Sequence, residues 1–132
     1  MFSSIGKLVY NPSTHLSSSK NWIVLMCDDE ISRYYCSLFN LSYKSKNGEY
    51  SGKLKRPVWG AHISVVRNEV YNIKNIKKNN QIFKFDYEPG VIDNKEHFWL
   101  KVHSKELIDF RRSLGLSDFP NFGFHLTIGR VN

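Results

Sequence analysis

Two segments of this chain, at 59–67 and 122–130, share one pattern of residue types. The first reads WGAHISVVR and the second FGFHLTIGR, so that both have an aromatic residue, a glycine, a histidine, an aliphatic residue and a hydroxyl residue in the same order. The two histidines, His62 and His125, lie 63 positions apart (125 − 62). Such a repeat constrains the fold of a 132-residue chain strongly, because it favours two similar halves that each contribute one equivalent strand.

Each segment alternates between polar and apolar residues in the way that is typical of a strand. Residues i and i+2 of a β-strand point to the same face. His62 therefore lies beside Ser64, and His125 lies beside Thr127. The aliphatic residues of the two segments point to the opposite face, towards apolar packing: Ile63, Val65, Leu126 and Ile128. Two such strands brought together form a cleft that contains two imidazoles and two hydroxyls.

Two imidazoles and two hydroxyls in one cleft are suited to acid–base chemistry on a phosphate. The pKa of histidine lies near neutral pH, so that one imidazole can take a proton from the attacking oxygen while the other gives a proton to the leaving oxygen. Hydroxyl groups can donate hydrogen bonds to the non-bridging phosphate oxygens. This scheme needs no metal ion or other cofactor. A single His-x-Ser strand is more often only a packed or surface histidine, and it is the second copy that favours a functional pair.

The duplicated His-x-Ser/Thr pattern, flanked by aliphatic residues, resembles the 2H phosphoesterase superfamily. That group includes LigT-type cyclic phosphodiesterases, eukaryotic 2′,3′-cyclic and 2′-5′ phosphodiesterases, and phage anti-CBASS nucleases that cut cyclic oligonucleotides. The resemblance implies catalytic roles for His62 and His125 and phosphate contacts from Ser64 and Thr127. It also implies an α+β fold with two pseudo-twofold lobes, in which antiparallel sheets line a central cleft and the helices lie outside.

The order of the predicted elements repeats one unit in each half of the chain. Carboxylates at Asp28, Asp29 and Glu30 favour the start of a helix over a metal site. Residues 44–57 are predicted to form a basic loop, and Glu88-Pro89-Gly90 a turn. Each half thus contains strand, helix and strand, and ends in a His-x-hydroxyl strand. The predicted strands are 7–10, 22–27, 58–67, 81–87, 97–103 and 122–131, and the predicted helices are 29–41 and 104–114.

Composition and charge are compatible with an anionic partner. The net charge is +7, the isoelectric point is near 9.5, and 14% of the residues are aromatic. A positive balance favours nucleic acid or nucleotides through long-range attraction, although proteins without such partners share it. Cys27 and Cys36 are typical of free thiols in a reducing compartment, and residues 1–10 lack the pattern of a signal peptide. Because no apolar run reaches membrane-spanning length, we expect one cytoplasmic domain over residues 1–132, monomeric or in a small homo-oligomer.

Aromatic and basic residues near the two motifs are further candidates. Trp59, Tyr10 and Phe122 are candidates for stacking on a base or for other substrate contacts, against the simpler interpretation that they belong to the core. Arg67 and Arg130 each follow a motif histidine by five positions. Strand alternation predicts that both arginines point away from the histidines, which favours a structural role for them.

These observations lead to three hypotheses of different classes. The first is a metal-independent phosphodiesterase that cleaves cyclic oligonucleotides, or RNA with 2′,3′-cyclic phosphate or 2′-5′ linkages. A phage enzyme that degrades nucleotide signals of host defence is one form of it, since the Lys/Asn-rich composition resembles phage proteins. The second is a non-catalytic protein that sequesters a nucleotide or RNA in the same cleft. The third is a small structural protein in which the motif is fortuitous.

Overall fold

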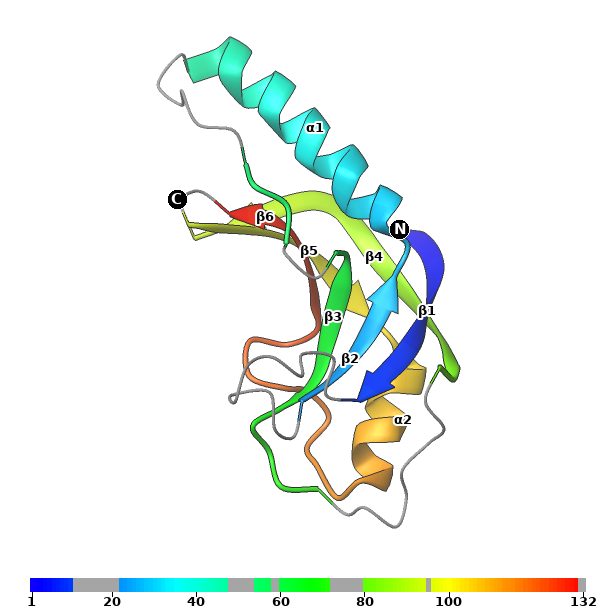
Figure 1. Cartoon of the computed structure of the whole chain (residues 1–132). Helices are drawn as coiled ribbons and strands as arrows, with labels where there is room; N and C mark the ends of the chain where they lie inside the picture. The colour runs from blue at the N-terminus through cyan, green and yellow to red at the C-terminus, as the bar shows by residue number, and fades with distance from the viewer. Residues whose placement is uncertain (11–21, 48–53, 58–59, 72–79, 95, 131–132) are drawn as a thin grey trace.

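The computed structural model describes residues 1–10, 22–47, 54–57, 60–71, 80–94 and 96–130, with only the backbone of 42–47. The described part is an α+β fold, as the sequence predicts. In chain order the elements are β1 (Phe2–Tyr10), β2 (Trp22–Cys27), α1 (Asp29–Asn47), β3 (His62–Arg67), β4 (Ile82–Asp93), β5 (His97–His103), α2 (Lys105–Ser113) and β6 (His125–Arg130) (Figure 1).

The six strands form one closed antiparallel barrel in the order β1-β2-β3-β6-β5-β4. This order divides into two halves of identical topology, because β1-β2-α1-β3 is followed by β4-β5-α2-β6. The halves meet at two seams, where β3 pairs with β6 and β1 pairs with β4. The predicted internal repeat, in which each half ends on a motif strand, is therefore confirmed.

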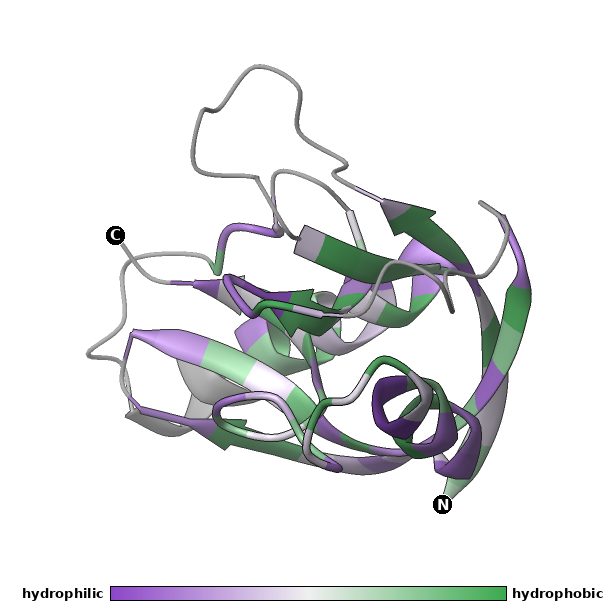
Figure 2. Ribbon diagram, turned by 90° about the horizontal axis from the view of Figure 1, so that it is seen from below, coloured by the Kyte–Doolittle hydropathy of each residue, from purple (hydrophilic) through white to green (hydrophobic). Residues whose placement is uncertain are grey.

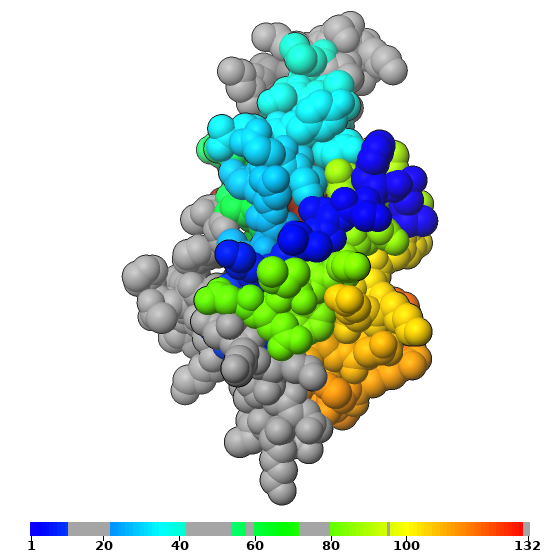
Figure 3. Space-filling model, turned by 90° about the vertical axis from the view of Figure 1, so that its right-hand side faces the viewer, coloured from blue at the N-terminus to red at the C-terminus, as the bar shows by residue number. Residues whose placement is uncertain are grey.

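Apolar side chains fill the inside of the barrel, and the two helices lie at its opposite ends. Along β5 the buried residues alternate with more exposed ones, and hydrophobic and hydrophilic residues alternate along the strands in general (Figure 2). The ring of Phe39 on α1 packs 4.6 Å from that of Phe98 on β5, and the ring of Phe110 on α2 packs 5.4 Å from that of Phe83 on β4. Figure 3 shows the β1–β4 side of the barrel, with α1 above it and α2 below.

Both helices begin at residues with recognisable capping chemistry, and α2 also ends at such a residue. The Oδ1 atom of Asp28 accepts a hydrogen bond from the Glu30 amide at the start of α1. The Oγ atom of Ser104 accepts one from the Leu107 amide, and a cap of this kind stabilises a helix by about 1 kcal/mol. Gly115 has φ +79° just after α2, a conformation that suits glycine. The helix-start interpretation of the acidic residues is confirmed for Asp28.

Several predicted boundaries are wrong. The turn predicted at 88–90 is part of β4, where a register shift between Tyr87 and Val91 accommodates Pro89, whose missing N–H is tolerated at a bulge. Helix α1 continues to Asn47, into the predicted loop, and β1 begins at Phe2 because it pairs with both β2 and β4. The motif strands begin only at the histidines, because residues with positive φ precede them.

Candidate active site at the seam between the motif strands

The seam between β3 and β6 brings the four predicted site residues together. Ile63 is paired with Leu126, and both side chains are wholly buried in the barrel. Ile63 with Leu126 is the pair that defines the register among the described residues, and extending it by one residue in either direction sets His62 opposite Thr127 and Ser64 opposite His125. Residues directly opposite each other have Cβ atoms about 5 Å apart. All four are half-buried and lie on the outer face of the seam.

Both imidazoles are held in the same orientation by a backbone carbonyl. The Nδ1 atom of His62 lies 2.9 Å from the Gly60 oxygen, and Nδ1 of His125 lies 3.1 Å from the Gly123 oxygen. A carbonyl oxygen can only accept a hydrogen bond, so Nδ1 carries the proton in each neutral ring. The lone pair of each ring is then on Nε2, which can act as a general base, or as a general acid once it is protonated.

Equivalent turns place these carbonyls. The Gly60 amide donates to the Pro57 oxygen at 3.1 Å, and the Gly123 amide donates to the Pro120 oxygen at 2.9 Å. Both glycines have positive φ, at +77° and +70°. The repeat therefore extends back to the two prolines, a signal that is present in the sequence but was missed by an alignment that starts at the aromatic residues.

The first turn is also attached to α1. The Oδ1 atom of Asp29 accepts a hydrogen bond from the Ala61 amide at 3.1 Å, and its Oδ2 atom accepts one from Arg56 at 2.8 Å. Asp29 therefore fixes the backbone directly before His62. The second motif strand is attached to the same helix, because Ser32 Oγ donates to the Thr127 carbonyl at 3.1 Å.

A tryptophan packs edge-on against each histidine. The Trp22 and His62 rings are 5.9 Å apart, and the Trp99 and His125 rings are 6.1 Å apart. Trp22 also donates from Nε1 to the Ser64 hydroxyl at 3.3 Å. The indoles thus cover one side of each imidazole, and Trp22 also holds the neighbouring Ser64 hydroxyl in place.

This partial burial changes the proton affinity of both imidazoles. Burial is the largest cause that lowers the pKa of His62 and of His125 below 6.5, and the hydrogen bond to the glycine carbonyl opposes it in each. The positive charge of Arg67 lowers the pKa of both histidines further, His125 adds to the effect on His62, and His97 adds to the effect on His125. Both imidazoles of the free protein are therefore mainly neutral at pH 7.

The prediction that Arg67 and Arg130 point away from the histidines is wrong. In β3 the register jumps by one residue, because Val24 pairs with Ser64 while Ile23 pairs with Val66. In β6 the corresponding jump lies opposite Phe98 and Trp99. An extra residue in a strand reverses the face of every residue after it. Arg67 therefore lies on the histidine face with its guanidinium 5.5 Å from the Trp22 ring centre, and Arg130 lies opposite His97.

A buried arginine that the functional interpretation missed holds the first of these bulges. Arg111 of α2 is wholly buried and donates from Nη1 to the carbonyl of Val65, the additional residue of the bulge, at 2.7 Å. The two Nη atoms of Arg111 also bind both carboxylate oxygens of Glu69, at 2.7 and 2.8 Å. Its spacing of four from Leu107 places Arg111 on the apolar face of the helix, which is the signal that could have identified it.

A cavity of about 260 Å³ opens beside the second histidine. Asn94, His97, Trp99, Phe122, His125 and Thr127 line it. Phe122 is 96% exposed and has φ +68°, a strained conformation for an aromatic residue. Of the other two stacking candidates, Tyr10 packs against the core opposite Ile23, and Trp59 lies outside the described residues.

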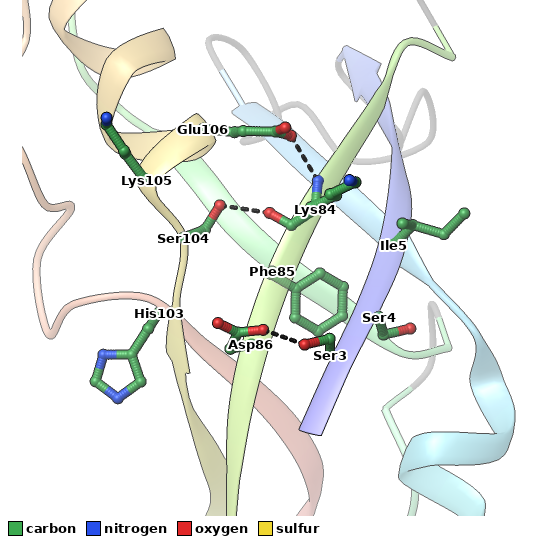
Figure 4. A pocket seen from close by; sticks show the side chains of 10 residues that line it. All are labelled: Ser3, Ser4, Ile5, Lys84, Phe85, Asp86, His103, Ser104, Lys105 and Glu106. Carbon is green, nitrogen blue, oxygen red and sulfur yellow. Dashed lines mark hydrogen bonds between the residues drawn. The ribbon is translucent and has the colours of Figure 1, made fainter. Parts of the chain in front are cut away.

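A larger cavity, of about 590 Å³, lies elsewhere. It is formed over β1, β4 and the start of α2, on the side of the barrel away from the β3–β6 seam (Figure 4). Several of its polar groups are paired with one another, since Ser3 donates to Asp86, Ser104 donates to the Lys84 carbonyl, and Glu106 accepts from the Lys84 amide. The smaller cavity is the candidate site, because it adjoins an imidazole whose Nε2 has no such internal partner among the described residues.

No protein-family model, curated protein or solved structure matches this chain. Within the described ranges, no three or more of the residues His, Cys, Asp and Glu are grouped so that they could hold a metal ion. No helix in that part of the chain has the length and apolar character needed to cross a membrane.

Proposed function

We propose that this protein is a metal-independent phosphodiesterase of the two-histidine type. Its substrate is a cyclic oligonucleotide, or RNA with a 2′,3′-cyclic phosphate or a 2′-5′ linkage. The observation that carries the proposal is the equivalent presentation of two Nε2 atoms, one from His62 and one from His125, on a single face where each imidazole lies opposite a hydroxyl. In this interpretation the halves β1–β3 and β4–β6 correspond to the two lobes of the 2H fold.

The proposed reaction is a displacement at phosphorus. One neutral histidine accepts a proton at Nε2 from the attacking oxygen, which belongs to water or to a ribose 2′-hydroxyl. That oxygen forms a bond to phosphorus, and the bond from phosphorus to the leaving oxygen breaks with its electron pair going to that oxygen. The second histidine, protonated at the start, donates its Nε2 proton to the leaving oxygen. Proton exchange with solvent then restores the starting state. The pseudo-symmetry of the site gives either histidine access to either role.

The hydroxyls and the cavity position the substrate in this scheme. Ser64 and Thr127 each lie opposite a histidine, so a phosphate between the imidazoles is within reach of both hydroxyls. A nucleobase of the substrate enters the 260 Å³ cavity, where Trp99 and Phe122 offer aromatic surfaces. A strained, fully exposed aromatic residue beside a cavity is a recurrent feature of binding sites. Nucleotide signals of a host defence system are one class of substrate that fits.

Purified protein incubated with EDTA and a substrate panel tests this proposal. The panel contains 2′,3′-cyclic nucleotides, 2′-5′ and 3′-5′ dinucleotides, and cyclic di- and trinucleotides. We expect His62→Ala and His125→Ala each to lose about 10²–10⁴-fold in rate, the usual contribution of a general acid or base. The matched control is His103→Ala, since His103 is exposed, pairs with Glu88 and lies away from the seam.

Two results would contradict the proposal. Full activity in either seam variant would exclude the two-histidine mechanism. Tight binding of one panel member without cleavage by the wild type would instead identify a protein that sequesters nucleotides.

A further inference from the structure

We propose that Arg67 is a further substrate-contacting group of this site, in addition to the two histidines and the two hydroxyls. Its guanidinium binds a non-bridging oxygen of the phosphodiester and stabilises the charge that grows on that oxygen as the attacking oxygen adds. The inference rests on the proposed function, but neither the sequence motif nor the two-histidine scheme assigns this arginine a contact with the substrate.

The bulge in β3 is the first observation that supports a substrate contact. Without it, Arg67 would point into the barrel side of the strand, like Ile63. With Val65 as an additional residue, Arg67 follows Ser64 as the next side chain on the outer face of the seam. Since Ser64 lies opposite His125, Arg67 is the next outward-facing residue of β3 after the one that faces the second imidazole.

The indole of Trp22 orients the guanidinium. The Cζ atom of Arg67 lies 5.5 Å from the centre of the Trp22 ring, and this ring also donates from Nε1 to the Ser64 hydroxyl. A cation–π contact attracts the charge of a guanidinium to the ring without using its N–H groups as hydrogen-bond donors, so that they stay able to donate. Trp22 therefore connects the arginine to a hydroxyl that is itself a predicted phosphate ligand.

The charge of Arg67 is not neutralised by an acid in the described part of the chain. Four other arginines there lie within 4 Å of a carboxylate: Arg33, Arg56, Arg111 and Arg112. Arg67 is exposed and has no such partner among the described residues. Its field reaches the site, because it lowers the pKa of both His62 and His125. An anion bound between the imidazoles would be stabilised by the same field.

The backbone on both sides of the bulge is held rigidly. Arg111 binds the Val65 carbonyl and both carboxylate oxygens of Glu69, and a Glu69 oxygen also accepts from the Arg67 amide at 3.5 Å. A donor fixed before the substrate arrives needs little reorganisation during the reaction, which is the condition for strong electrostatic stabilisation. Arg111 is therefore a positioning residue for Arg67.

The two halves of the site differ in a way that orients the substrate. Arg67 and Trp22 lie on the β2–β3 side, whereas the 260 Å³ cavity lies on the β5–β6 side. Arg130, the counterpart of Arg67, lies opposite His97 and is not among the charges that shift the pKa of either seam histidine. The non-bridging oxygen of a bound phosphodiester therefore faces Arg67, and its nucleoside extends into the cavity.

The test compares Arg67→Met, Arg67→Lys and the control Arg112→Met. Methionine removes the charge and keeps an unbranched side chain against Trp22, and Arg112 offers the same charge change on an exposed face of α2. We expect kcat of Arg67→Met to fall by about 10²–10³-fold, as for the loss of one charge-stabilising donor, with Arg67→Lys between it and the wild type. Histidine NMR titration without ligand should show both seam pKa values raised in Arg67→Met and unchanged in Arg112→Met.

Binding of inorganic phosphate, followed by the same NMR signals, separates this inference from the proposed function. If the wild type cleaves a panel substrate and Arg67→Met cleaves it at the same rate, the role of Arg67 is refuted while the phosphodiesterase assignment stands. If the wild type cleaves no panel substrate but binds phosphate, and Arg67→Met no longer binds phosphate, the anion contact stands and the assigned reaction fails. Equal phosphate affinity in the wild type and Arg67→Met overturns the contact itself.

Discussion

Replacing Arg111 with methionine removes the connection between α2 and the bulge of the first motif strand. Arg111 is wholly buried and donates to the Val65 carbonyl and to both oxygens of Glu69. It also donates to the carbonyls of Ser117 and Phe119 at 2.8 and 3.1 Å. One side chain thus satisfies acceptors from β3, from the segment after β3 and from the loop after α2.

The expected loss of stability follows from the groups that Arg111→Met leaves behind. Methionine donates no hydrogen bond, so the Val65 carbonyl loses the donor that Arg111 supplies, at a cost of about 1–3 kcal/mol. The Glu69 side chain is only 26% exposed, and removing one partner of a buried ion pair costs about 3–5 kcal/mol. The two effects overlap because one side chain serves both, so we expect about 4 kcal/mol in total, or a fall in Tm of roughly 16 °C for a domain of this size.

Thermal unfolding followed by far-UV circular dichroism at pH 7 measures this loss. Arg112→Met is the matched control, because Arg112 is the exposed neighbour that pairs with Asp118 on the surface, and we expect it to unfold near the wild-type temperature. A fall in Tm of less than about 4 °C for Arg111→Met would mean a loss below about 1 kcal/mol and would refute the reasoning.

The pH dependence of the same measurement identifies the ion pair as the source. Hydrogen bonds from Arg111 are the main cause that lowers the pKa of Glu69 below 4.5. A carboxylate with a lowered pKa contributes stability above its unfolded value and loses it as pH falls through the folded value. The difference between the wild type and Arg111→Met should therefore shrink below pH 4.5. A difference that is the same at pH 7 and pH 3 would assign the whole effect to the neutral hydrogen bonds.

Two further predictions concern the site. The proposed reaction requires one neutral and one protonated histidine in the free enzyme, and the pKa of both histidines lies below 6.5. The value of kcat/KM should therefore be highest below pH 6.5 and fall as pH rises, and Arg67→Met should move this fall to higher pH. A wild-type optimum above pH 8 would contradict the assignment. Phe122→Gly should raise the free energy of unfolding by about 1 kcal/mol, because φ +68° is strained for phenylalanine, and it should weaken binding of a base-bearing substrate. Phe122→Ala is the control, because it removes the ring but keeps the backbone strain. Equal stability of the two variants would exclude the strain.

The sequence determined the features that depend on neighbours along the chain. Alternation within β3 and β6 sets each motif histidine beside its hydroxyl, and the repeat predicts two halves with the same order of strand, helix and strand. The cap at Ser104 and the glycine after α2 are equally local. Such features follow from backbone geometry over two to four residues, so a single sequence is sufficient to predict them.

Only the tertiary structure decided how these local pieces face one another. The register that sets His62 opposite Thr127 depends on which residues of β3 and β6 pair, and the bulge that turns Arg67 towards the histidines depends on a carbonyl that Arg111 binds from 46 residues away. The cavity beside His125 likewise combines residues of β5, β6 and the loops before them. Strand alternation predicts a face only while pairing is regular, and one additional residue reverses it, so the orientation of Arg67 was fixed by contacts between distant segments.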